Sequence, residues 1–350
     1  MTKGLAERQR VFARIDDVHC VVFHLAVLAA YAVAFWVYLH PAQAGIEGPW
    51  SKIAFVVAAA GLLGWISGVD VGVNFHNHTH RRVFRSPRLN RWFGRVWTFS
   101  GGWPSYFWEH AHVRVHHANV MEPSDWTLPV RRGDGRFENV WRYCALHWPW
   151  RYAGHLWHDF RTGRGGHKVG RRALKELAIF AVLWSIPFWI DVEMALVLWV
   201  LPHFVANCVT MGSGMYVQHA GGSPRSSGAR FQHSNTFLSR FFNLTMFNIG
   251  YHLEHHEFPG VHWADLPALH ARMRQVYAAE GGRVVPYGYY KAARIVSSVF
   301  DPDGSYVRFT HSDLLPAFQR PAVRTAAWVD PSLEANRRHR PAVRLERRSG

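Results

Sequence analysis

The chain has 350 residues, 49% of them hydrophobic, which is enough for one large domain or two smaller ones. It carries 24 His, 17 Trp and 23 Phe, and its formal charge of +16 would attract nucleic acid, anionic lipid or an acidic protein. Its three cysteines, Cys20, Cys144 and Cys208, lie far apart without a Cys-x-x-Cys pair. This pattern excludes a zinc ribbon and a rubredoxin-like iron site, and it is typical of a reducing compartment.

Residues 1–17 carry charges of both signs and end at no small-residue cleavage site, so we expect no signal peptide. Four apolar stretches that follow are long enough to cross a membrane. Trp and Tyr residues border them, which favours membrane spans over the buried helices of a soluble protein. Only Asp191 and its neighbours separate the last two stretches, so these two should form a helical hairpin. The predicted spans are about 18–39, 53–75, 174–190 and 192–217.

The charges around these spans predict their orientation. Lys and Arg precede the first span, fill the long loop from Arg81 to Arg172, and return after the fourth span. The loop His40–Ser51 and the turn at Asp191 contain acids and no Arg. By the positive-inside rule, both termini and the long loop are cytoplasmic. The net charge is then a signal of topology and of a membrane surface, and nucleic acid is an unnecessary explanation.

Two stretches of the long loop, Leu89–Phe107 and Val140–Phe160, mix aromatic residues with Arg, which is typical of helices lying in the membrane interface. The tail at residues 320–350 is rich in Arg and Pro and poor in large apolar residues, so we expect disorder there. Residues 18–319 are then predicted to form one membrane domain after a short cytoplasmic N-terminal segment.

Three histidine clusters follow the span ends. Residues four apart share one face of an α-helix, so His76 should pair with His80 and His112 with His116. Adjacent histidines diverge by about 100°, so a His–His pair is better suited to two metal ions than to one. The clusters are His76-Asn-His-Thr-His80, His112-Val-Arg-Val-His116-His117 and His252-Leu-Glu-His255-His256, in which the third would form one narrow stripe.

The ligand type indicates the metal. Imidazole suits Zn, Cu, Fe and Ni, and no thiolate accompanies these histidines. A structural zinc site needs four ligands, which is fewer than the clusters offer. Carboxylate-bridged di-iron bundles use Glu-x-x-His motifs that this chain lacks in a suitable set. A site rich in His and poor in carboxylate therefore indicates iron that reacts with O₂ near lipid.

The three clusters resemble the histidine boxes of the membrane-bound fatty acid desaturase superfamily, which includes hydroxylases and ketolases. The resemblance runs from about Asn74 to His270 and is most specific at Asn248-Ile-Gly-Tyr-His-Leu-Glu-His-His-Glu-Phe-Pro-Gly. It implies an all-α integral membrane protein, with four transmembrane helices and a cytoplasmic helical cap that holds two irons. The implied ligands are His76, His80, His112, His116, His117, His219, His252, His255 and His256.

Some neighbours of these residues are open to other interpretations. Asn77 stands where many members of the superfamily have Asp, and His78 and His110 compete with the implied ligands, although the family register favours the outer histidines. His233 is a weaker candidate, and His24 and His203, which fall within spans, have no assigned role. Candidate partners that orient the imidazoles are Asp70, Asp125, Asn248 and Glu254.

The resemblance implies an O₂-dependent di-iron oxidoreductase acting on an aliphatic chain, most simply a fatty acid desaturase. A hydroxylase or ketolase is an alternative, as is a fatty acid decarboxylase that forms terminal alkenes, for which Arg114 could anchor the carboxylate. A metal transporter is a remote alternative, because its ligands would lie near the bilayer midplane. The chain shows no flavin fingerprint, fused haem domain or Cys cluster, so an external ferredoxin-like or rubredoxin-like donor is expected.

Overall fold

The computed structural model describes residues 11–130, 137–162, 166–286 and 288–289. Four of its helical stretches are long and apolar enough to cross a membrane: Asp17–Leu39, Gly48–His80, Arg172–Ile190 and Val192–His219. They coincide with the four predicted spans, and the second and fourth extend further, to the histidines that follow them. The predicted tail at residues 320–350 lies outside the described residues.

The elements of the four long stretches run in chain order. The first is a single helix, whereas the second and fourth contain π-helical segments (η) within the α-helix. Their bounds are α2 Asp17–Leu39; α3 Gly48–Val69, η1 Asp70–Phe75 and α4 His76–His80; α9 Gly166–Trp184 and α10 Ile186–Ile190; α11 Val192–Ala195, η4 Leu196–Val200, α12 Leu201–Phe204, η5 Val205–Met211 and α13 Gly212–His219.

The predicted hairpin between the third and fourth stretches is present. Asp191 adopts an extended backbone and its carboxylate accepts a hydrogen bond of 2.7 Å from the Met194 amide, which caps α11. The second and fourth stretches pack closely, because a Cβ atom at Gly64 would lie 2.5 Å from Val205 Cβ and one at Gly68 2.4 Å from Thr210 Cβ. This close packing brings the ends of α4 and α13 towards one region.

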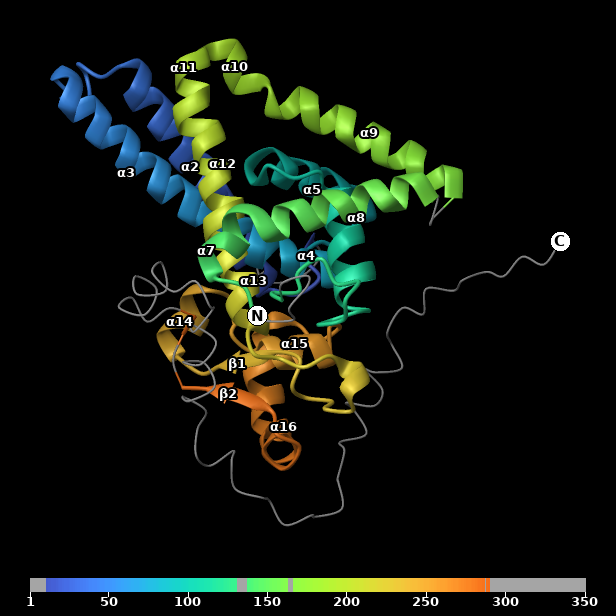
Figure 1. The fold of residues 1–350 in the computed structure, drawn as a ribbon. Helices are drawn as coiled ribbons and strands as arrows, with labels where there is room; N and C mark the ends of the chain where they lie inside the picture. The colour runs from blue at the N-terminus through green and yellow to red at the C-terminus, as the bar shows by residue number, and fades with distance from the viewer. Residues whose placement is uncertain (1–10, 131–136, 163–165, 287, 290–350) are drawn as a thin grey trace.

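Shorter elements fill the long loop and the C-terminal part. The two loop segments predicted to be interfacial do contain helices, α5 and α8. In Figure 1 the C-terminal elements gather at the end of the molecule opposite the α10–α11 turn. The bounds are α5 Pro87–Gly101, α6 Ser105–Glu109, η2 His110–His116, α7 Val140–Arg142, η3 Tyr143–His147, α8 Trp148–Thr162, the 3₁₀ turn η6 Arg225–Ser227, β1 Asn235–Phe237, α14 Arg240–Thr245, α15 His252–Glu257, the 3₁₀ turn η7 Trp263–Asp265, α16 Leu266–Ala279 and β2 Arg283–Val285.

The all-α prediction needs one correction, because β1 and β2 form a short parallel ladder with Asn235 paired to Arg283. The Arg283 side chain donates to the Asn235 carboxamide oxygen at 2.7 Å and to the Ala220 carbonyl at 3.1 Å. These bonds join the end of the fourth long stretch to the C-terminal part. Three-residue strands without a clear period-2 pattern leave too little signal for prediction from sequence.

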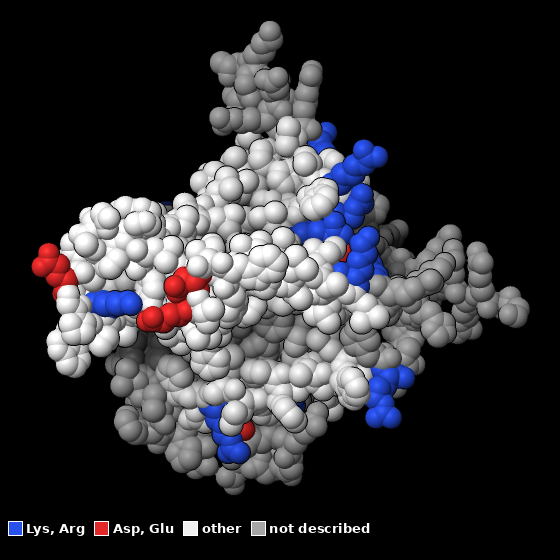
Figure 2. All heavy atoms as spheres, turned by 90° about the horizontal axis from the view of Figure 1, so that it is seen from above, with Lys and Arg blue, Asp and Glu red and all other residues white. Residues whose placement is uncertain are grey.

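Much of the outer surface of the long helices is apolar. Trp36, Trp50 and Trp189 are exposed, along with aliphatic side chains on all four stretches. Figure 2 shows one such face, which is mostly uncharged, with most of its Lys and Arg along one side and a few acidic side chains, beside one basic side chain, on the other. An exposed apolar surface of this extent is typical of a protein that contacts lipid or another protein.

Candidate metal centre

All nine implied histidines come together in the structure. They arrive from α4, from η2 and the residue after it, from the end of α13 and from α15. Their ligand atoms form two groups, and within each group these atoms lie within 4.8 Å of one another. The five-histidine group is His76, His80, His112, His117 and His255, and the four-histidine group is His116, His219, His252 and His256.

Each pair of adjacent histidines is divided between the two groups. His116 and His256 belong to the four-histidine group, whereas His117 and His255 belong to the five-histidine group. This division is the one expected from side chains that diverge by about 100° along a helix. The arrangement therefore offers two neighbouring metal positions bridged by the same two elements, η2 and α15.

His112 and His116, predicted to pair on one helical face, belong to different groups. They lie in a π-helix, in which the backbone bond runs from residue i+5 to residue i, and the His117 amide donates to the His112 carbonyl at 3.0 Å. The wider turn aligns His112 with His117 instead. The third box is not one stripe either, because His252 pairs with His256 while His255 faces the other group.

The spacing of the imidazoles suits an ion at the centre of each group. Two nitrogen ligands at about 2.1 Å from one ion, at right angles to each other, lie about 3.0 Å apart. In the five-histidine group, Nε2 of His76 lies 2.8 Å from Nε2 of His255, and Nε2 of His80 lies 3.1 Å from Nε2 of His112. In the four-histidine group, Nε2 of His252 lies 3.2 Å from Nε2 of His219 and 3.1 Å from Nε2 of His256.

The environment favours the neutral imidazole, which is the form that binds a metal. Burial and the neighbouring imidazoles hold the pKa of five of these histidines well below its usual range. Because a lowered pKa disfavours the second proton of the imidazolium form, one nitrogen of each ring keeps a lone pair that is available to a cation. The five are His112, His117, His252, His255 and His256.

Asp125 orients one ring of the four-histidine group. His116 Nδ1 donates to the Asp125 carboxylate at 3.0 and 3.1 Å, which turns its Nε2 towards the group. Burial alone would raise the pKa of Asp125, but the charge and hydrogen bond of His116 lower it below its usual value. The amides of Met121 and Thr127 also donate to this carboxylate, at 3.0 and 2.9 Å.

A second set of contacts, which the sequence does not predict, holds His219. His219 Nδ1 donates to the His233 carbonyl at 3.0 Å, and the His233 ring bonds Glu257 at 3.1 Å. Arg225 in turn donates to Glu257 at 2.8 Å. The only signal in the sequence was the position of His233 shortly after the fourth span and of Glu257 directly after the third box.

Three other candidate partners lie elsewhere. Asp70 pairs with His24 Nδ1 at 2.6 Å and accepts from Asn74, so it links α2 to η1 rather than orienting a box histidine. Glu254 bonds Thr236 and His270, at 2.6 and 2.5 Å. The Asn248 amide donates to the Trp263 carbonyl at 3.1 Å. These polar groups satisfy one another inside the fold, which sequence spacing does not reveal.

The competing histidines fall outside both groups. His78 is buried, its ring packs on Phe75, Phe93 and Trp97, and its Nδ1 accepts from the Val83 amide. His110 likewise belongs to neither group. His203, on α12, bonds the carbonyls of Trp199 and Ser100. The histidines that converge are thus the nine implied ligands.

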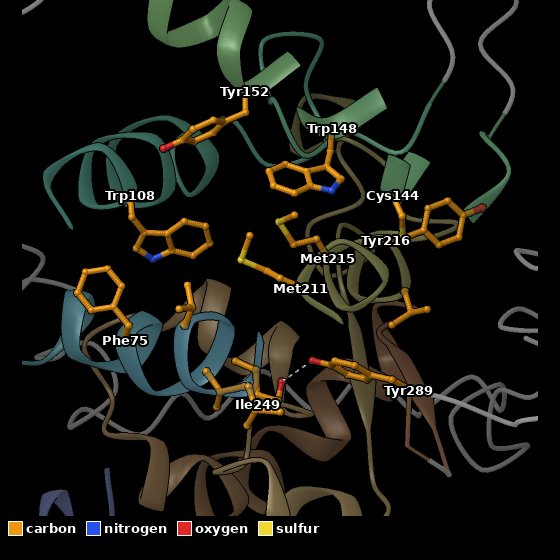
Figure 3. Packing of buried hydrophobic residues seen from close by; sticks show 14 of the residues in the cluster. Phe75, Trp108, Cys144, Trp148, Tyr152, Met211, Met215, Tyr216, Ile249 and Tyr289 are labelled. Atoms are coloured by element: carbon orange, nitrogen blue, oxygen red, sulfur yellow. Dashed lines mark hydrogen bonds between the residues drawn. The ribbon is translucent and has the colours of Figure 1, made fainter. Parts of the chain in front are cut away.

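Both groups border one apolar pocket, which encloses about 660 Å³ including its open mouth. His76 and His112 reach it from the five-histidine group, and His116 and His252 from the four-histidine group. Figure 3 shows part of its wall, in which Met211 and Met215 lie between Trp108 and Ile249. The lining residues include Trp and Phe, and also Met and Gly.

Arg114 does not reach this pocket. It projects from η2 between His112 and His116, yet its side chain is exposed. Among the residues that the structure describes, none that lines the pocket is charged. The role of Arg114 as a carboxylate anchor therefore stays a prediction, and any carboxylate that it held would lie outside the pocket.

Comparison with known proteins agrees with this geometry. The family model "fatty acid desaturase" matches residues 49–288, which contain all nine histidines and most of the pocket. Comparison with curated proteins gives no match. With a match over more than half of its length and with the three histidine boxes brought together, the chain belongs to the fatty acid desaturase family.

Proposed function

We propose that this protein is an O₂-dependent, non-haem di-iron oxidoreductase that desaturates the aliphatic chain of a fatty acid or lipid. The observation that carries this proposal is an apolar pocket bordered by histidines of both groups. An alkyl chain in that pocket would lie next to both metal positions. The family supports an oxidoreductase of the fatty acid desaturase kind.

The nine histidines would hold two iron ions, five imidazoles around one and four around the other. When bound, iron supplies the redox chemistry by which O₂ and external electrons remove hydrogen from an unactivated C–H bond. The protein's own residues bind and orient. Asp125 and the His233 carbonyl fix the tautomers of His116 and His219, and the Met and Trp wall of the pocket excludes water.

Desaturation needs reductant and protons as well as O₂. One saturated chain, one O₂, two electrons and two protons give one alkene and two waters. The electrons would come from a ferredoxin-like or rubredoxin-like protein, and an acidic carrier of that kind would suit the arginines at the surface near the centre, among them Arg81, Arg82 and Arg85.

Four membrane spans with both termini on the cytoplasmic side would place the centre in the cytoplasm. The four long apolar helices and the positive charges that flank them support this topology. His76 and His219, at or near the ends of the second and fourth stretches, would then lie on one side of the bilayer. Residues 18–319 would form the membrane domain.

The pocket disfavours a decarboxylase, because no charged side chain among its described residues could hold a substrate carboxylate. It also disfavours a transporter, because the histidines lie at and beyond the ends of the long helices rather than at their centres. A hydroxylase would use the same groups and pocket, so product analysis separates it from a desaturase.

The test is expression in bacteria, with the iron content of the purified protein measured and lipids, free fatty acids and volatiles profiled by mass spectrometry. We expect a product that has lost two hydrogens. The His252→Ala variant should give no product, whereas the His78→Ala variant, which removes a buried histidine outside both groups, should still give it. A protein that binds iron and changes no lipid or fatty acid under any donor would contradict the proposal.

A further inference from the structure

Helix α14 forms one side of the pocket mouth and carries an apolar outer face. Phe242, at its third position, and Met246, directly after it, line the pocket. Phe241 and Leu244, on its other face, are 77% and 83% exposed, which makes them two of the most exposed large apolar side chains among the described residues. A short helix that is apolar on both faces needs an apolar environment outside as well as inside.

The fold prevents α14 from turning this outer face inwards. The Asn243 carboxamide donates to the Phe237 carbonyl at 2.7 Å and accepts from the Gly250 amide at 3.1 Å, and Asn243 itself is buried. The Ser239 hydroxyl caps the helix by accepting from the Phe242 amide at 3.3 Å. These bonds fix α14 between β1 and the third histidine box, so Phe241 and Leu244 must point outwards.

Helix α3 contributes the most exposed residue of the pocket lining, Trp65. Trp65 is 47% exposed. Gly68 and Gly72 lie on the same helical face as Trp65, beyond the junction of α3 with η1 in the case of Gly72, and they also line the pocket. The exposed apolar surface of α3 extends further along the helix to Leu62 and Val57. The pocket mouth is therefore continuous with the outer surface of a helix that is long and apolar enough to cross a membrane.

We propose that the pocket opens sideways into the bilayer, through a portal framed by Trp65, Phe242 and Met246. Phe241 and Leu244 insert among the lipid chains beside it, and the exposed Arg240 meets the lipid phosphates. The inference rests on the proposed function and names its substrate class. The substrate is a chain that already resides in the membrane, such as a lipid acyl chain, rather than a thioester delivered from water.

The first test locates α14 without using turnover. In the full-length protein, the half-buried Cys208 is replaced by Ser and Leu244 by Cys. An environment-sensitive fluorophore is attached to the new cysteine, and the protein is placed in vesicles of phosphatidylcholine and phosphatidylglycerol. The matched control is Gln275→Cys, an exposed polar position on α16. We expect lipids with a nitroxide on the acyl chain to quench the label at 244 and aqueous iodide to quench the one at 275. Quenching at 244 by iodide and not by the nitroxide lipid would overturn the portal.

The second test asks how the substrate arrives. The double variant Phe241→Asp/Leu244→Asp changes no residue that lines the pocket. We expect it to lose at least about tenfold in turnover of a chain embedded in vesicles, while turnover of the same chain in detergent micelles stays within about twofold. Unchanged turnover in vesicles, or an equal loss in both media, would overturn the portal. A wild-type protein inactive in both media would instead count against the proposed function, and the quenching result would still stand.

Discussion

The two histidine groups differ in how their imidazoles are held. The five-histidine group has more rings, none of which bonds a carboxylate among the described residues, and it borders a second, smaller cavity of about 340 Å³ through His80 and His255. The four-histidine group has fewer rings, and two of these, His116 and His219, are held by Asp125 and the His233 carbonyl. A group with fewer ligands depends more on the orientation of each one.

Because of this difference, the two metal positions should differ in how well they tolerate the loss of one imidazole ligand. Removal of one ring from the five-histidine group leaves four, the number that a closed tetrahedral site uses. Removal of one ring from the four-histidine group leaves three. The polar contacts of the four-histidine group therefore compensate for its smaller number of ligands. Substitutions that remove either a ligand or its polar partner should distinguish these two contributions.

The largest effect should follow the loss of a ring from the four-histidine group. His256→Ala should lower the iron content from two ions per chain to one and lower turnover by more than about 100-fold, the upper end of the loss seen for residues that merely orient a ligand. His80→Ala should keep more iron, because four imidazoles remain. Iron per chain by mass spectrometry and turnover are the measurements.

His78→Ala is the control for this pair, because it removes a buried ring of the first box that belongs to neither group. Its iron content should match that of the wild type. Equal iron loss in His256→Ala and His80→Ala would show that ligand number does not distinguish the groups.

A smaller effect is expected from the carboxylate that orients His116. Asp125→Asn removes the charge and should weaken iron binding at the four-histidine group by about 10- to 100-fold. Asp70→Asn is the matched control, since it changes another buried aspartate that pairs with His24 instead. Iron retention during titration with a chelator measures both, and equal retention in the two variants would contradict the orienting role of Asp125.

These two aspartates show where prediction from sequence ends. Apolar length, a local property, predicted the four long helices, and the resemblance to the desaturase histidine boxes implied which histidines converge. The partner of a buried carboxylate depends on which helices pack together. Asp70 lies six residues before His76 but faces His24 on α2, whereas Asp125, nine residues after His116, folds back onto it.

Local deviations of the backbone were also beyond prediction. An α-helical period pairs His112 with His116, and the π-helical turn of η2 pairs His112 with His117. The sequence carries no recognisable signal for that change, although π-helical turns are common at functional sites. The partners of His219 and the exposed face of α14 were missed for a similar reason, because both depend on contacts between distant segments.

Glu257 offers a milder test of the support around the four-histidine group. It acts on His219 only through His233, so Glu257→Gln should weaken iron binding by less than about tenfold, below the loss for Asp125→Asn. Glu280→Gln, at an exposed position after α16, should have no effect. Chelator titration of the three variants gives the order, and a loss for Glu257→Gln larger than that for Asp125→Asn would contradict the relay through His233.

The smallest effect is expected at Arg114, which lies on η2 between a ligand candidate of each group. Its side chain is exposed and lines neither the pocket nor the smaller cavity, so Arg114→Ala should change turnover by less than about twofold. Met215→Trp, which adds bulk to the pocket wall, is the positive control and should lower turnover of long chains much more. The informative measurement is KM for a free fatty acid beside KM for its neutral ester. If Arg114→Ala raised only the first by tenfold or more, a carboxylate would bind outside the apolar pocket, and η2 would orient the substrate as well as both metal positions.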